Sequence, residues 1–196
     1  FFYVWNEVYM NGVGAGMLDE DLDGTAEPRP DLAGRLDFVG VNYYTRVTVD
    51  GVARSALPAL SPLLTFNPLN LVLWEDYPRG LYEMIAYVND TFGVPSIVTE
   101  NGTMDPFETR ASFLVRHLTW VARAIADGYD VRGYFYWSLI DNYEWNHGLD
   151  LKFGLFGYDP QDPTKARVAR DYAHVYGRIA EDREISMELQ QQYPAP

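Results

Sequence analysis

Three short apolar runs, each followed by a segment with helical periodicity, constrain the fold of this chain more than any other feature. The runs span residues 36–44 (LDFVGVNYY), 95–99 and 131–140 (VRGYFYWSLI). Their β-branched and aromatic residues predict buried strands. Because each strand is followed by a helix long enough to cross over, the pattern predicts an α/β fold, a parallel sheet with helices on its outer face.

The predicted helices have apolar stripes and residues typical of helix ends. We expect Gly93 to end the first helix and Gly128 to end the second. Asp105, Pro106 and Glu108 have the spacing of an N-cap and its first turn, so the second helix is expected to begin there. The three stripes comprise Leu81, Ile85, Val88 and Phe92; Leu114, Leu118, Val121 and Ile125; and Val168, Tyr172, Val175 and Ile179.

The rest of the chain is predicted to be one helix and two loops. Residues 1–13 have a helical pattern, which the Asn-Gly pair at 11–12 is expected to close. Residues 14–30 are acidic and contain prolines, so we predict an acidic loop. Residues 50–75 carry three prolines without periodicity, which predicts a long loop of a kind that is usually functional. Because no repeat or low-complexity linker divides the chain, residues 1–196 are interpreted as a single domain.

The charge balance and the absence of cysteine exclude several classes of function. The chain has 15 Lys and Arg against 28 Asp and Glu, a net charge of −13, which argues against nucleic acid and anionic membranes as partners. Without cysteine there is no disulfide framework and no thiolate metal site. No apolar run approaches the roughly 18 residues of a membrane span. We expect no cofactor, and we take a cytoplasmic location as the expectation.

Polar and aromatic residues follow all three predicted strands. They are Asn42 and Tyr44, then Glu100, then the segment 137–145. In parallel α/β folds these strand ends lie together, and ligands bind there. Carboxylates and amides hydrogen-bond hydroxyl groups, and indole rings stack on sugar faces, so the pattern predicts a sugar site. The alternative is that Glu100 marks the exit of a strand to solvent and that Glu144 is a solvated loop acid.

Four motifs resemble those of glycoside hydrolase family 1, the β-glucosidase and β-galactosidase family. They are NYY at 42–44, TENG at 99–102, GYFYWSLIDNYEWNHG at 133–148 and FGL at 153–155. The resemblance covers roughly residues 31–180. It implies a TIM (β/α)8 barrel, which usually needs about 200 residues or more. Since only three strand–helix units are clear, the chain is interpreted as the C-terminal part of such a barrel, about units six to eight.

The resemblance also implies roles for individual residues. Glu100 corresponds to the catalytic nucleophile, and Tyr44 would donate a hydrogen bond that keeps it ionised and aimed. Asn42 would hydrogen-bond near the nucleophile and the sugar, and Trp137 would form the platform under the glycone. The residues implied to contact or border the outer sugar hydroxyls are Glu144, Trp145 and Phe153. Asp150 and Lys152 replace the family's usual Ser or Thr and Arg, which affects the expected glycone preference.

The implied function is that of a retaining β-glycosidase acting on β-glucoside-like carbohydrates. This chain would supply the nucleophile half of the site, because the family's Asn-Glu-Pro general acid/base has no counterpart. Asn6-Glu7 is similar, but Val8 replaces the proline and only 36 residues separate Asn6 from Asn42, so we interpret the pair as helix surface. An N-terminal barrel half or a second copy is the expected partner. The alternative is a non-catalytic sugar-binding or assembly subunit.

Two further patterns suggest metal binding and are set aside. Asp19, Asp21 and Asp23 match the first half of a calcium loop, but its twelfth position is Pro30 instead of a bidentate glutamate. A solvated acidic loop is therefore the preferred interpretation. The three histidines have no metal-ligand spacing; they are His117 and His174, which we expect to be packing or surface residues on helices, and His147, which could border the entrance to the site. We expect no metal.

Overall fold

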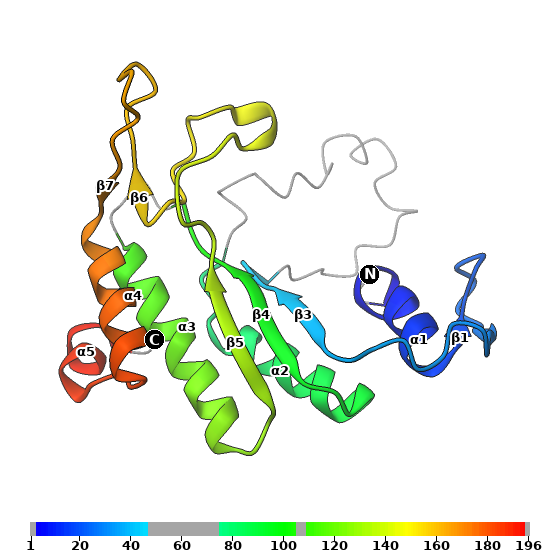
Figure 1. Ribbon diagram of the computed structural model, residues 1–196. Helices are drawn as coiled ribbons and strands as arrows, with labels where there is room; N and C mark the ends of the chain where they lie inside the picture. The colour runs from blue at the N-terminus through cyan, green and yellow to red at the C-terminus, as the bar shows by residue number, and fades with distance from the viewer. Residues whose placement is uncertain (1–2, 47–74, 105–108, 195–196) are drawn as a thin grey trace, which may run out of the picture.

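The computed structural model of the chain describes residues 3–46, 75–104 and 109–194 (Figure 1). The central sheet comprises β3 (Val39–Asn42), β4 (Ser96–Asn101) and β5 (Val131–Tyr136). The helices are α1 (Val8–Ala15), preceded by a π-helical turn (Tyr3–Glu7), α2 (Arg79–Phe92), α3 (Arg110–Ala126), α4 (Asp171–Asp182) and α5 (Met187–Gln192). Two short ladders pair β1 (Met17–Leu18) with β2 (Glu27–Pro28) and β6 (Phe156–Gly157) with β7 (Val168–Ala169).

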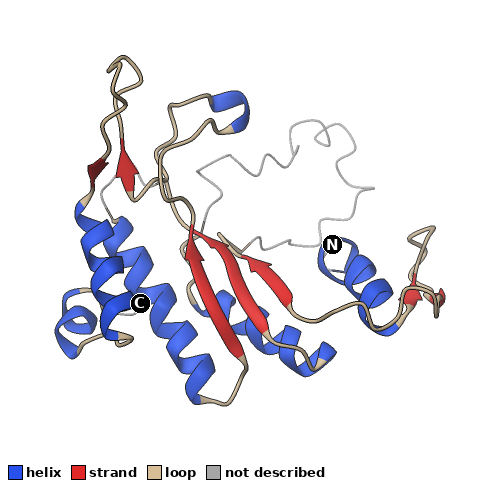
Figure 2. Ribbon diagram, viewed as in Figure 1, coloured by secondary structure: helices blue, strands red, loops and turns tan. Residues whose placement is uncertain are grey.

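The sheet has the order β3–β4–β5, and both strand pairs are parallel (Figure 2). The helix α2 connects β3 to β4, and α3 connects β4 to β5, so the predicted parallel sheet with helical crossovers is confirmed. Two of the strands are shorter than predicted. The run 131–140 leaves the sheet after Tyr136 because residues 138–141 pair with the backbone of residues 153–156 instead.

The core lies between the sheet and the helices that cover one of its faces. Val41 and Val98 of the sheet pack against Leu81 and Ile85 of α2 and Val121 of α3, and all five side chains are buried. A second cluster joins α3 to α4 and α5; its buried members include Leu114, Leu118, Tyr172, Ile179 and Leu189. Burying one such aliphatic side chain contributes about 1.5–3 kcal/mol, so these two clusters hold the helices on the sheet.

Several helix boundaries follow the sequence signals and others do not. As predicted, α2 ends at Phe92, and Gly93 follows in the left-handed conformation. The expected closure of the first helix at residues 11–12 is wrong, because α1 continues to Ala15 and Gly16 provides its C-cap. The expected start of the second helix falls on residues 105–108, outside the described residues, and α3 begins at Arg110. Apart from Glu75, the predicted loop 50–75 also lies outside them.

Two residues of the predicted apolar stripes are exposed. Ile125, near the end of α3, has 53% of its surface exposed, and Val168 has 66% exposed. Val168 belongs to β7, where it pairs with Gly157, so α4 begins only at Asp171. A cross-strand pairing has taken priority over the helical periodicity at this position.

The acidic segment 14–30 contains the β1–β2 ladder, and it is not uniformly solvated as expected. Asp19 is only 1% exposed. Its carboxylate accepts hydrogen bonds from the Tyr3 hydroxyl at 2.7 Å and from the backbone N–H groups of Asp23 at 3.1 Å and Gly24 at 2.8 Å. The buried side chain of Asp19 therefore helps to organise this loop, and the absence of a metal there stays a prediction.

The longest described helix is α3, with 17 residues. Within the described ranges, neither α3 nor any other helix is both long and apolar enough to cross a membrane.

Candidate active site

The carboxyl ends of β3, β4 and β5 lie at one edge of the sheet, and predicted site residues gather there (Figure 1). Asn42 ends β3 and is the register partner of Glu100 in β4. Trp137 follows β5 directly, and its backbone N–H donates to the carbonyl of Asn101 at 3.0 Å. The structure thus brings residues from three separate segments to one place, as the sequence predicted.

An irregularity in β4 decides which way Glu100 faces. The register with β5 shifts between Val98 and Asn101, and the register with β3 shifts at Asn42. Strict alternation from the buried residues Ser96 and Val98 would also bury position 100, but the structure buries Asn101 instead and leaves Glu100 partly exposed. Such bulges often re-aim a side chain beside an active site. Here the bulge directs the carboxylate of Glu100 away from the helix-covered face.

Tyr44 and Glu100 are joined by a short hydrogen bond. The Tyr44 hydroxyl donates to Oε2 of Glu100 at 2.6 Å, a bond that the charge of the carboxylate strengthens. Burial raises the pKa of the Tyr44 phenol well above its ordinary value, and the bond to Glu100 raises this pKa further. Tyr44 therefore remains a donor at neutral pH, and it fixes the orientation of the carboxylate beside it.

The side chain of Asn42 is oriented by Thr99. The Thr99 hydroxyl donates to Oδ1 of Asn42 at 2.7 Å across the β3–β4 pair. This bond turns the amide oxygen toward Thr99, so the amide group of Asn42 has a fixed direction at the strand ends.

Asn101 connects all three strand ends, although no sequence pattern predicts this role. Its side chain is fully buried; Nδ2 donates to the Tyr43 carbonyl at 2.7 Å, and Oδ1 accepts from the Tyr134 hydroxyl at 2.7 Å. The predicted strand ends at residue 99, whereas β4 continues to Asn101. The next residue is Gly102, and only glycine fits there because a Cβ would overlap the carbonyl oxygen of Trp137. The motif TENG therefore provides a buried amide and a close backbone contact.

Glu144 and Trp137 form the second pair of the site. Indole Nε1 of Trp137 donates to Oε1 of Glu144 at 3.3 Å, and Glu144 is only 5% exposed. The alternative in which Glu144 is a solvated loop acid is therefore wrong. Trp145 lies beside Glu144 in a short 3₁₀ turn (Trp145–His147), and its side chain is 77% exposed. The structure thus buries Trp137 and Glu144 more deeply than Trp145.

Phe153 is buried against Tyr44. Their ring centroids are 6.3 Å apart with an interplanar angle of 81°, an edge-to-face contact. The family resemblance implies that Phe153 lies beside Glu144 and Trp145, and the structure also places it behind the tyrosine that hydrogen-bonds Glu100. Phe153 therefore supports the Tyr44–Glu100 pair from the side.

Glu7, His117 and His174 lie in helical segments. Glu7 lies in the N-terminal helical segment, as expected. Burial of Tyr87 in α2 raises the pKa of its phenol, and the charge of Glu7 raises this pKa further. His117 is buried in α3, with Nδ1 2.9 Å from the carbonyl of Phe113, and burial lowers its pKa to about 3. His117 is thus a neutral packing residue, and His174 is exposed on α4.

Comparison with known proteins yields a family match and curated relatives. The model of glycosyl hydrolase family 1 matches residues 15–185. The β-galactosidase of Sulfolobus acidocaldarius is 40% identical over 172 residues, which cover 83% of this chain and 35% of that protein. The bifunctional β-D-glucosidase/β-D-fucosidase of Bifidobacterium breve is 35% identical over 193 residues, which cover 85% of this chain and 40% of that protein. The chain thus spans little more than a third of the length of these relatives.

Solved structures give the same result for the fold. The β-glycosidase from Thermosphaera aggregans has a TM-score of 0.78 and 34% identity, with 100% of this chain and 42% of that chain covered. The β-glycosidase from Pyrococcus horikoshii has a TM-score of 0.74 and 34% identity, with coverages of 99% and 45%. The expected architecture, part of a (β/α)8 barrel, is confirmed.

Proposed function

The chain belongs to glycosyl hydrolase family 1, and from this premise we propose that it supplies the nucleophile half of the site of a retaining β-glycosidase. The observation that carries the proposal is the bond between Tyr44 and Glu100, 2.6 Å long, at the carboxyl ends of the parallel strands. A carboxylate held there by a buried phenol suits a nucleophile that must stay ionised and aimed. The substrates would be β-glucoside-like carbohydrates, in line with the β-galactosidase and β-glucosidase names of the relatives.

In the proposed mechanism, Glu100 attacks the anomeric carbon. A bond forms between a carboxylate oxygen of Glu100 and this carbon, while the glycosidic bond to the leaving oxygen breaks. A second carboxyl group, about 5–5.5 Å from the first in retaining enzymes, protonates the leaving oxygen. Water then attacks the glycosyl–enzyme ester, its proton passes to the second carboxylate, and Glu100 is released. We propose that the second carboxyl group comes from an N-terminal barrel half.

Trp137, Glu144 and Asn42 would hold the sugar during this reaction. The indole ring of Trp137 offers a face for stacking, and its N–H fixes the carboxylate of Glu144 at 3.3 Å. Glu144 would accept hydrogen bonds from sugar hydroxyls, and the oriented amide of Asn42 would contact the sugar near Glu100. Trp145 would lie exposed at the rim of the sugar site, and Phe153 would lie behind Tyr44.

The stereochemical course of hydrolysis tests this proposal. The full protein that contains this chain would be mixed with an aryl β-glucoside, and the first sugar anomer released would be followed by proton NMR. Double displacement predicts that the β-anomer appears first and then mutarotates. If the α-anomer appears first, the nucleophilic role of Glu100 is wrong. If no sugar is released but the protein binds glucosides, the non-catalytic alternative replaces the proposal.

We predict that Glu144→Gln weakens catalysis without destabilising the fold. The amide keeps the shape of the side chain but removes the charge, and a hydrogen bond to a charged group contributes about 1.5–3 kcal/mol. The ratio kcat/KM for an aryl β-glucoside should therefore fall about ten- to hundredfold, while the melting temperature stays within a few degrees. A kcat/KM equal to that of the wild type would exclude Glu144 from sugar binding.

We also propose that the partner of this chain is the N-terminal part of the barrel, in a cytoplasmic protein. In the described part of the chain, β3 and β5 are the outer strands of the sheet, so each leaves one edge open. Phe38 and Phe135, next to or within these strands, are 51% and 61% exposed. Open edges and exposed aromatic rings favour pairing with further strands.

The isolated chain is accordingly predicted to associate. Sedimentation velocity of residues 1–196 at micromolar concentration should show dimers or larger species, because the two open edges can pair with one another. Addition of the N-terminal part of the same protein should replace these species by a defined one-to-one complex. A stable monomer that ignores the N-terminal part would contradict the proposed partner.

A further inference from the structure

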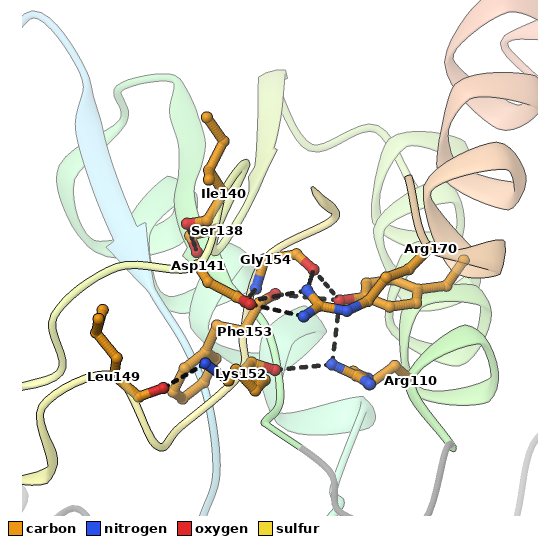
Figure 3. A network of polar contacts seen from close by, with 10 residues as sticks. Arg110, Ser138, Ile140, Asp141, Leu149, Lys152, Phe153, Gly154 and Arg170 are labelled. Carbon is orange, nitrogen blue, oxygen red and sulfur yellow. Dashed lines mark hydrogen bonds and ion pairs between the residues drawn. The ribbon is translucent and has the colours of Figure 1, made fainter. Parts of the chain in front are cut away.

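The segment that carries Phe153 is held by the ion pair of Arg170 and Asp141 (Figure 3). Arg170, which immediately precedes α4, binds Asp141 through two contacts, Nη1 to Oδ1 at 3.0 Å and Nη2 to Oδ2 at 2.6 Å. Asp141 is buried and the side chain of Arg170 is 22% exposed, so this is a partly buried, bidentate pair. Removing either partner would leave the other charge without compensation.

Both backbone groups of Gly154 are bound by the same residues. The N–H of Gly154 donates to Oδ1 of Asp141 at 2.9 Å. Its carbonyl accepts from Nη1 of Arg170 and from the hydroxyl of Tyr172, as Figure 3 shows for the arginine. We call Arg170, Asp141, Gly154 and Tyr172 the Arg170 cluster. It fixes the backbone at position 154 from three sides.

The backbone next to Gly154 is paired with residues 138–141. The N–H of Leu155 donates to the carbonyl of Ser138 at 2.8 Å, and the N–H of Ser138 donates to the carbonyl of Phe153 at 3.3 Å. A Cβ at Gly154 would lie 2.6 Å from the carbonyl carbon of Ile140, so only glycine permits this approach. The pairing sets the position of Phe153 relative to Trp137, the neighbour of Ser138.

A continuous path of contacts leads from the Arg170 cluster to Glu100. Phe153 adjoins Gly154 in the chain and packs edge-on against Tyr44, with 6.3 Å between ring centroids. Tyr44 in turn donates to Glu100 at 2.6 Å. Movement of the backbone at Gly154 would therefore move Phe153, and Tyr44 would lose its lateral support.

We propose that Arg170 and Asp141 are positioning residues for the nucleophile, acting through Phe153 and Tyr44. The inference rests on the proposed function, because it assigns them the task of aligning Glu100 for attack. Misplacement of a reacting group by about 1 Å can cost about a hundredfold in rate. A distant ion pair can thus limit catalysis although neither residue touches the substrate.

The test compares Arg170→Met and Arg170→Lys in the full protein. Arg170→Met should lower kcat for an aryl β-glucoside about ten- to hundredfold, and this loss should exceed any rise in KM, because the path of contacts from Gly154 ends on Glu100. Arg170→Lys keeps the charge and should recover part of the loss. Hydrogen exchange of the peptides spanning 138–156 should increase in Arg170→Met. A suitable control is Arg132→Met, since Arg132 forms an exposed pair with Asp130 at the opposite end of β5; it should change neither quantity.

The outcomes separate a failure of the inference from a failure of the proposed function. If Arg170→Met loosens residues 138–156 but keeps kcat within twofold, the positioning role is wrong. If exchange is unchanged, the Arg170 cluster does not hold this segment, and the inference also fails. If the wild-type protein does not hydrolyse glucosides, the proposed function fails. The exchange data then still show whether the Arg170 cluster holds residues 138–156. Should Arg170→Met not fold, Asp141→Asn, which keeps the side-chain shape, is measured in its place against the same two criteria.

Discussion

Glu100→Gln is expected to lower kcat/KM for aryl β-glucosides by about four orders of magnitude or more in the full protein, the scale of losing a catalytic nucleophile. The amide oxygen can still accept the hydrogen bond from Tyr44, so the fold and the binding of the sugar should be preserved. What is lost is the negative charge that attacks the anomeric carbon. Steady-state kinetics together with thermal denaturation would separate loss of catalysis from loss of structure.

Glu7→Gln provides the matched control for this variant. Glu7 follows an asparagine, as the family's general acid/base does, but it lies in the N-terminal helical segment near Tyr87 of α2. Its substitution should leave kcat/KM unchanged. A Glu100→Gln variant that keeps activity within tenfold of the wild type, or a Glu7→Gln variant that loses it, would refute the assignment.

Asn101→Ala is expected to destabilise the protein by about 2–5 kcal/mol. The substitution leaves the Tyr43 carbonyl and the Tyr134 hydroxyl without their bonds to the Asn101 side chain, and each unsatisfied buried group costs about 1–3 kcal/mol. Denaturant unfolding measures the change in free energy. Asn42→Ala, which removes one partly solvated bond to Thr99, should cost less than about 1 kcal/mol. Equal losses for the two variants would mean that Asn101 does not join the strand ends.

Much of the fold could be predicted from local patterns. The helix α2 and its stop at Gly93 follow from an apolar stripe and a glycine, both of which act within one or two helical turns. The parallel sheet follows from the alternation of strands and helices, which leaves few alternative topologies. The gathering of Asn42 and Glu100 follows in turn, because parallel strands end at the same edge.

The features that escaped prediction depend on contacts between distant segments. The early end of β5 results from pairing of residues 138–141 with 153–156, and Val168 leaves the helical pattern because it pairs in β7. The burial of Asn101 depends on a bulge in β4, which period-two alternation does not show. The pair of Asp141 and Arg170 joins residues 29 positions apart, and neither has a local signal that predicts the other.

Covalent trapping of Glu100 tests the central claim most directly. A 2-deoxy-2-fluoro glucoside with fluoride or dinitrophenolate as leaving group would be incubated with the full protein, and a proteolytic digest would be analysed by mass spectrometry. The fluorine slows both the formation and the hydrolysis of the glycosyl–enzyme. The good leaving group needs little protonation and restores the rate of formation, so the glycosyl–enzyme should accumulate. We predict an adduct on Glu100 that Glu100→Gln abolishes. An adduct on Glu7 or Glu144, or labelling of Glu100→Gln as fast as that of the wild type, would contradict it.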